Sequence, residues 1–129
     1  MRPSFQESRS WFAKFRDAFA GIASAFYEER SFHVHLAFLV AVIGAGIWLR
    51  VSLVEGCLLG LCVTAVLVAE MMNTALEWMA REVVKEDNAN VGRALDIGSG
   101  AVLLAAIGSA GVGGTIFVYR IGVMLGWWA

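Results

Sequence analysis

Three long apolar runs constrain this fold most, because each can cross a lipid bilayer as a helix once its flanking residues are included. A spanning helix needs about 20 residues, and we place the spans at about residues 33–50, 53–80 and 95–119. The chain has 129 residues, 59% apolar and 16% charged, and a soluble domain of that size could not bury so much apolar surface. We therefore expect an all-α membrane protein, a single membrane domain over residues 1–129.

The segment before the first span is typical of an amphipathic helix, over residues 8–29. Its apolar stripe alternates steps of three and four residues and consists of Phe12, Phe15, Phe19, Ile22 and Phe26. We favour a helix that lies in the membrane interface over one packed on protein, and the two are compatible. Charges occur throughout this start and no continuous apolar core is present, so we do not expect a cleaved signal peptide.

Lysine and arginine predict the orientation, because they gather in the cytoplasmic loops of membrane proteins. Eight of the ten lie before the first span or between the second and third: Arg2, Arg9, Lys14, Arg16, Arg30, Arg81, Lys85 and Arg93. Only Arg50 and Arg120 lie on the other side. We expect the N-terminus inside and the C-terminus outside. The net charge of −1 and the lack of a basic tract argue against nucleic acid as a partner.

Polar residues interrupt the second span near its cytoplasmic end, in the segment AEMMNTALEWM (69–79). Glu70, Asn73, Glu77 and Arg81 follow one another at steps of three, four and four residues, which places them on one face of a helix. A carboxylate within the hydrocarbon costs roughly 2.5–3.5 kcal/mol on insertion scales, so it usually serves a function. Glu70 suits a general base, and Glu77, nearer to water, suits a hard cation.

Simpler interpretations of these carboxylates stay open. Glu70 could be a polar clamp between helices, and Glu77 an ordinary interfacial charge. Glu29 and Asp96 are expected at the cytoplasmic level of Glu77. Carboxylates that converge from separate elements at one membrane face suit a site for magnesium and phosphate.

The third span is rich in glycine, alanine and serine, and small residues let helices approach closely in lipid. Because three spans enclose little core, we expect a homo-oligomer. Before this span, residues 81–94 (REVVKEDNANVGRA) predict a polar connection in which the Asn-Ala-Asn run at 88–90 and Gly92 interrupt the helix. We interpret His33 and His35 as interface histidines that point to different faces.

Three segments resemble motifs of the prokaryotic diacylglycerol kinase family, which includes the undecaprenol kinases. EMMNTALE matches the E-x-x-N-[S/T]-A-x-E signature, ERSFHVHL resembles E-x-N-F-R-I-H, and RALDIGSGAVLL resembles R-A-K-D-x-x-x-A-V-L. The segments stand in the family's order, and the likeness covers about residues 8–120. The resemblance implies a homotrimer in the bacterial inner (cytoplasmic) membrane, with active sites shared between neighbouring chains at the cytoplasmic interface.

The reaction that the resemblance implies is phosphorylation of a membrane lipid alcohol, either diacylglycerol or undecaprenol, with ATP as co-substrate. Glu70 would be the base for the lipid hydroxyl, with Asn73 in the same catalytic cluster and Ser99 also at the lipid. Glu29 and Glu77 would bind the Mg²⁺ that carries ATP. The implied nucleotide-binding residues are Glu29, Glu77, Glu86, Asn88 and Asp96.

Two positions depart from the family pattern. Leu95 replaces the lysine before Asp96, and Arg81 replaces an aspartate four residues after Glu77. Leucine cannot neutralise a polyphosphate, and we hypothesise that Arg81 supplies the missing positive charge. The departures leave open altered nucleotide preference, or a non-catalytic trimeric membrane protein that keeps the fold. A proton or ion pathway through Glu70 is a weaker alternative, because the charges cluster at one face of the membrane.

Overall fold

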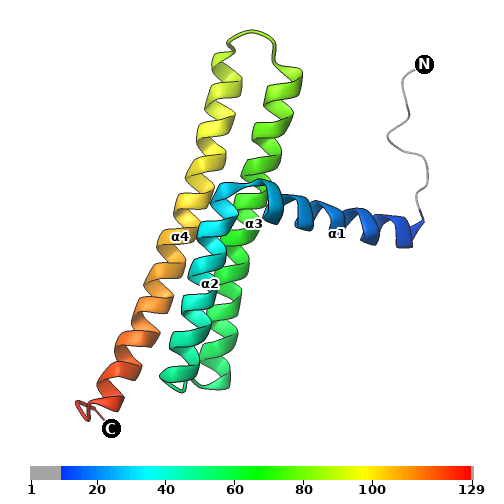
Figure 1. Cartoon of the computed structure of the whole chain (residues 1–129). Coiled ribbons are helices and arrows are strands. Elements are labelled where there is room, and N and C mark those ends of the chain that lie inside the picture. The colour runs from blue at the N-terminus through cyan, green and yellow to red at the C-terminus, as the bar shows by residue number, and fades with distance from the viewer. Residues whose placement is uncertain (1–9, 129) are drawn as a thin grey trace.

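The structure, a computed structural model, describes residues 10–128 as four helices joined by short connections (Figure 1). They are α1 (Trp11–Glu28), α2 (Arg30–Trp48), α3 (Leu53–Val83) and α4 (Ala89–Met124). As the sequence predicts, three of them, α2 to α4, are long and apolar enough to cross a membrane. Residues 8 and 9 of the expected surface helix, and Arg2 and Arg9 of the charge count, lie outside the described residues.

Helices α3 and α4 form a long antiparallel hairpin that organises the chain (Figure 1). They approach closely: the Ser109 hydroxyl donates to the carbonyl of Cys62 at 3.1 Å, and a Cβ at Gly113 would lie 3.6 Å from Leu59. With 31 and 36 residues, both helices exceed the about 20 needed to cross a bilayer. The turns nearest their connection, which we call the hairpin tip, extend past the level at which α1 meets α2 (Figure 1).

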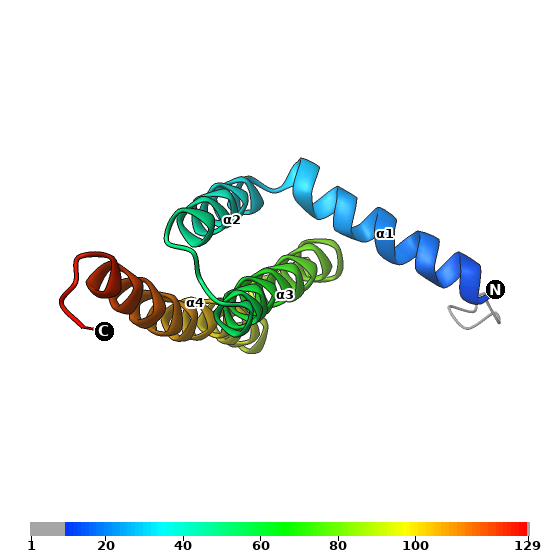
Figure 2. The same ribbon diagram turned by 90° about the horizontal axis from the view of Figure 1, so that it is seen from below.

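Helix α1 extends away from the other three helices, and none of its residues is buried (Figures 1 and 2). Ser10 caps its first turn by accepting a hydrogen bond from the Ala13 N–H at 3.3 Å. The helix ends at Glu28, and the backbone of the next residue, Glu29, is extended before α2 begins. Phe32 is fully buried just beyond this corner, with its ring centroid 5.1 Å from that of Phe26. This aromatic contact fixes where α1 leaves the bundle.

The connection between α3 and α4 is shorter than the sequence predicts. Only residues 84–88 are non-helical, so Asn90 and Gly92 lie inside α4, and the prediction that they interrupt the helix is wrong. The cause is the Asn88 side chain, whose Oδ1 accepts from the N–H groups of Asn90 and Val91 at 3.0 and 3.3 Å. An asparagine in that role starts a helix, and a single glycine within a helix costs only about 1 kcal/mol relative to alanine.

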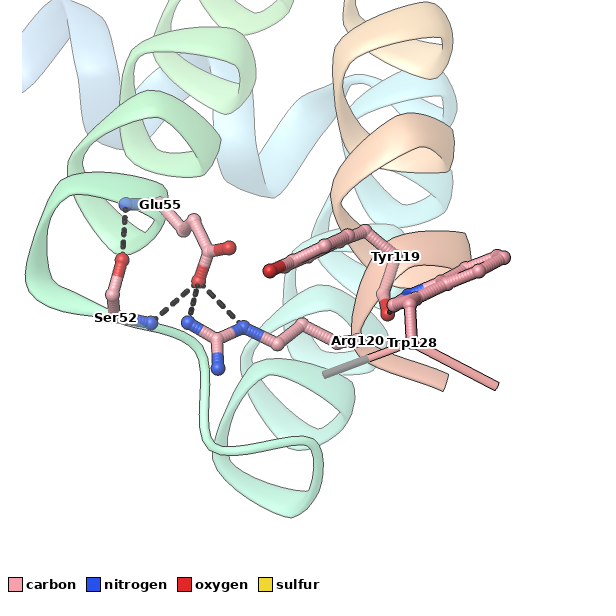
Figure 3. Close-up of polar contacts among 5 residues, drawn as sticks. All are labelled: Ser52, Glu55, Tyr119, Arg120 and Trp128. Carbon is pink, nitrogen blue, oxygen red and sulfur yellow. Dashed lines mark hydrogen bonds and ion pairs between the residues drawn. The ribbon is translucent and has the colours of Figure 1, made fainter. Parts of the chain in front are cut away.

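An ion pair joins the start of α3 to the end of α4 (Figure 3), and these ends lie opposite the hairpin tip (Figure 1). Glu55 Oε2 accepts from Nε and Nη2 of Arg120 at 2.8 and 2.5 Å, and from the Ser52 N–H at 2.6 Å. Ser52 and Glu55 also form a capping box. Nearby, Trp128 stacks on Tyr119 and donates its indole N–H to the Tyr119 carbonyl at 2.9 Å.

Replacing Arg120 by Gln should destabilise the folded chain, because the Glu55 side chain is only 17% exposed and would lose its charged partner. We expect the thermal midpoint in detergent to fall by several degrees. The double variant Glu55→Gln/Arg120→Gln should recover most of that loss, since it leaves no unpaired charge. Arg93→Gln is the control, because Arg93 is exposed and makes no polar contact with another described residue. Equal midpoints for Arg120→Gln and Arg93→Gln would show that the ion pair contributes nothing.

Candidate active site

Glu70, Asn73, Glu77 and Arg81 form what we call the polar stripe of α3. This stripe faces the two other long helices. Glu70 and Asn73 are buried, each only 8% exposed. Toward α2, Glu70 Oε2 lies 3.7 Å from His35 Nε2. Toward α4, Asn73 lies against Gly98, where an added Cβ would stand 2.5 Å from Asn73 Oδ1. The stripe therefore lies where α2, α3 and α4 come together.

Along α3, the stripe is connected by polar contacts and becomes more exposed toward the hairpin tip. Asn73 Nδ2 donates to Glu77 Oε1 at 2.8 Å, and Arg81 Nη2 lies 3.5 Å from Glu77 Oε2. The side chain of Glu70 is 11% exposed, whereas that of Glu77 is 42% exposed. Asn73 Oδ1 is buried and has no hydrogen-bond partner among the described residues. The same face of α3 thus carries the buried carboxylate of Glu70 and the more exposed carboxylate of Glu77.

Glu29 reaches the stripe through Trp78. The indole N–H of Trp78 donates to Glu29 Oε1 at 2.7 Å, and Trp78 directly follows Glu77 in α3. The carboxylate at the α1–α2 corner is therefore held against the turn of α3 that carries Glu77. Sequence reasoning assigns no role to Trp78, and the only available signal is that an indole N–H close to protein usually finds an acceptor.

The carboxylates of Glu29 and Glu77 would suit a magnesium ion that arrives with a nucleotide better than a permanent metal centre. Within residues 10–128, no three His, Cys, Asp or Glu side chains gather into a group that could hold a metal ion. Magnesium in phosphoryl-transfer sites commonly takes one or two protein carboxylates, with phosphate oxygens and water completing its shell. Glu29, held against Trp78, and the neighbouring Glu77 would supply two carboxylates, so phosphates would have to supply the remaining oxygens.

A hollow of about 630 Å³ lies at the hairpin tip, next to the exposed end of the stripe. It is formed by the last turns of α3, the connection 84–88 and the first turns of α4. Its charged and amide-bearing lining residues are Glu77, Arg81, Lys85, Glu86, Asp87 and Asn88. Leu95 lines it as well. Glu86 and Asn88, to which the family resemblance gives a nucleotide-binding role, therefore share one hollow with Glu77, and Asn88 also caps α4.

An apolar groove of about 410 Å³ lies on the other side of Glu70, between α2, α3 and α4. His35, the neighbour of Glu70, lines it together with Leu67 and Ala106, and it continues past Leu59 and Phe117. Apart from His35, Cys62 and Ser109, its lining is aliphatic, aromatic or glycine. A groove with this lining accommodates a hydrocarbon chain and leaves a polar end group beside His35 and Glu70.

Asp96 and Ser99 do not join this stripe within one chain. Both are exposed and make no polar contact with another described residue. Gly98 is the residue of α4 that faces Asn73, and Asp96, two residues earlier, lies about 200° away around the helix. Ser99 lies about 100° from Gly98. Asp96 is therefore turned away from Glu70, Asn73 and Glu77 of its own chain, and Ser99 lies on the flank of α4 beside them.

The two histidines of α2 have different surroundings. His33 is exposed, and its Nε2 lies 3.1 Å from the carbonyl of Phe26 at the helix corner. His35 is 21% exposed at its side chain and points to Glu70. The sequence places the two histidines on different helix faces, but it does not predict that His35 contacts Glu70. A single sequence does not report which residues of two helices meet.

Comparison with known proteins agrees with the motifs on α3 and α4. The profile of the prokaryotic diacylglycerol kinase family matches residues 16–117. The diacylglycerol kinase of Synechocystis sp. (strain PCC 6803) is 34% identical over 116 residues, which are 89% of this chain and 66% of that protein. The chain thus spans just under two thirds of the Synechocystis protein.

Two further relatives are a second diacylglycerol kinase and an undecaprenol kinase. The diacylglycerol kinase of Escherichia coli K12 is 36% identical over 88 residues, 67% of this chain and 71% of that protein. The undecaprenol kinase of Bacillus subtilis is 28% identical over 115 residues, 89% of this chain and 94% of that protein. The chain therefore belongs to the prokaryotic diacylglycerol kinase family, a family of lipid kinases.

Proposed function

We propose that this protein transfers the γ-phosphoryl group of ATP to the hydroxyl group of a membrane lipid, with Mg²⁺ as the cofactor. The observation that carries the proposal is the arrangement along α3. Glu70 is buried beside an apolar groove, and Glu77, about two turns further, opens onto a polar hollow. The acceptor is diacylglycerol or undecaprenol, since relatives with both names are similar to this chain.

In this reaction Glu70 takes the proton of the lipid hydroxyl as the oxygen attacks the γ-phosphorus. The bond from that phosphorus to the bridging oxygen breaks, and ADP leaves. Asn73 keeps the Glu77 carboxylate in place through its 2.8 Å hydrogen bond. Glu29 and Glu77 would hold magnesium, which supplies charge that offsets the polyphosphate. Phosphoryl transfer needs little further covalent help, so the residues contribute mainly by holding the two substrates in line.

The placement of Asp96 and Ser99 supports a homotrimer with shared active sites. Both are exposed on α4 and make no polar contact with the described stripe residues of their own chain, which leaves them available to the stripe of a neighbouring copy. Among the described residues, only Phe32, Leu49, Leu59 and Ile116 form a buried apolar core. In such an assembly Asp96 would serve the nucleotide of the neighbour and Ser99 its lipid.

The exposed phenylalanine side chains of α1 support an interfacial position for this helix. Phe12, Phe15 and Phe19 are 79%, 61% and 70% exposed, and an amphipathic helix with such a face lies in the head-group region. The hairpin tip would then project into the cytoplasm, where ATP is found, with the C-terminus outside. This topology corresponds to the inner membrane of a bacterium.

The test is transfer of labelled phosphate from ATP in mixed micelles that contain diacylglycerol or undecaprenol, with magnesium present or chelated. Transfer to either lipid that stops on chelation would support the proposal and identify the acceptor. If the folded trimer transferred phosphate to neither lipid, the kinase proposal would fail and the non-catalytic alternative would replace it.

Arg81 is proposed to neutralise the polyphosphate in place of the family lysine. Arg81 and Leu95 line the same hollow, so a guanidinium on α3 can reach the space that a lysine at position 95 would occupy. Its contact with Glu77 is long, at 3.5 Å, and leaves the guanidinium available to phosphate. Lys85 lines the hollow as well.

Replacing Arg81 by Ala should raise the KM for ATP roughly tenfold or more, because a hydrogen bond between charged groups contributes about 1.5–3 kcal/mol. The KM for lipid should change little. Adding Leu95→Lys to the Arg81→Ala variant should restore most of the affinity for ATP. Arg93→Ala, an arginine of α4 outside the hollow, is the matched control. An unchanged KM in Arg81→Ala would assign the neutralising charge to another residue.

A further inference from the structure

Among the described residues, His35 alone brings a basic side-chain nitrogen within 4.0 Å of the Glu70 carboxylate. Its Nε2 lies 3.7 Å from Glu70 Oε2, and both side chains are largely shielded, with 21% and 11% exposed. Along α3, Asn73 is directed to Glu77 instead. Among the described residues, no other charged side chain forms an ion pair or hydrogen bond with Glu70. The carboxylate therefore depends on His35 for its orientation.

The position of His35 is itself fixed by packing. Phe32, one turn earlier in α2, is fully buried, and its ring meets the imidazole edge-on with centroids 6.4 Å apart. Phe32 in turn packs on Phe26 at the α1–α2 corner. Because Phe32 is buried and contacts rings on both sides, its own ring is fixed by packing. The contact with Phe32 therefore gives the imidazole of His35 a defined direction. His35 also lines the apolar groove, so it lies between the groove and Glu70.

We propose that His35 is a positioning residue for Glu70. Its Nε2 lies 3.7 Å from Oε2 of the carboxylate, and such a contact shortens to a hydrogen bond when substrate binds. With Oε2 held in this way, Oε1 faces the hydroxyl group at the end of a lipid in the groove. A free carboxylate rotates about its last bond and presents either oxygen in many directions, whereas an anchored carboxylate spends more time in line with the acceptor. This inference rests on the proposed lipid-kinase function, in which Glu70 is the base.

The test compares His35→Leu with His35→Gln in the full-length protein, with transfer from ATP to lipid in mixed micelles as the assay. Leucine removes the polar contact, and kcat should fall roughly ten- to a hundredfold, as expected when a reacting group is misplaced, while the KM for ATP stays within about twofold. Glutamine keeps an amide nitrogen at a reach similar to Nε2, and should retain most of the activity. His33→Leu, which removes the exposed histidine two residues earlier, should change kcat little.

A double-variant comparison separates positioning from a general effect on folding. If His35 acts through Glu70, then His35→Leu should cause no further loss in a Glu70→Gln background, since the group that it positions is already absent. The positioning role alone would be overturned if His35→Leu lowered kcat by the same factor in the wild type and in Glu70→Gln. It would also be overturned if His35→Leu kept the wild-type kcat while Glu70→Gln was inactive. A wild-type protein without transfer to lipid would overturn the proposed function and this role together.

Discussion

Replacing Glu70 by Gln should nearly abolish phosphate transfer to lipid, with a loss in kcat of roughly 10²–10⁴-fold, as expected when a general base is removed. Glutamine has almost the same shape as glutamate, and its carbonyl oxygen can still face His35 Nε2. It cannot take a proton from the acceptor hydroxyl. Because Glu70 lies about two turns from Glu77 and the hollow at the hairpin tip, the KM for ATP should change little.

The same variant should fold as well as the wild type or slightly better. A carboxylate shielded between apolar helices is costly, so removing its charge should not lower the thermal midpoint in detergent. Glu82→Gln, which removes an exposed carboxylate further along α3, is the matched control and should keep its activity. A Glu70→Gln protein that still transferred phosphate at the wild-type rate would show that the proton goes to another group.

The number and the order of the helices could be predicted from the sequence, because apolar runs separated by polar connections report which segments prefer lipid. Their ends could not. Predicted spans stop where the side chains become polar, near 80 and again near 95, whereas α3 continues to Val83 and α4 starts at Ala89. Hydropathy reports the solvent around a segment, whereas the helix end depends on a cap such as Asn88.

The site could be predicted along α3 but not across the helices. Steps of three and four residues place Glu70, Asn73 and Glu77 on one face whatever surrounds them, and the 2.8 Å bond from Asn73 to Glu77 agrees with that face. The contacts of His35 with Glu70 and of Trp78 with Glu29 depend on how far one helix slides along another. That offset is set by the packing of many side chains at once, for which a single sequence carries no local pattern.

Replacing Gly98 by Ala should lower kcat roughly ten- to a hundredfold, through Asn73. The new Cβ would stand 2.5 Å from Asn73 Oδ1 and 3.3 Å from Leu76 Cδ1. The first of these distances is shorter than two non-bonded atoms can approach, so Asn73 must move. Crowding of this kind costs about 1–3 kcal/mol. Because the crowded atom ends a side chain, Asn73 can relieve the contact by turning, and turning breaks its bond to Glu77.

The expected signature of Gly98→Ala is a loss of activity larger than the loss of stability, since the helices themselves need not move. Gly100→Ala is the matched control, because a Cβ at Gly100 would meet nothing within 4 Å, and it should retain wild-type activity and thermal midpoint. Asn73→Ala removes the crowded side chain, so adding Gly98→Ala to it should cost no further activity. If Gly98→Ala matched the wild type, the bond from Asn73 to Glu77 would be dispensable, and the role of Asn73 would have to be sought at its unpaired Oδ1 instead.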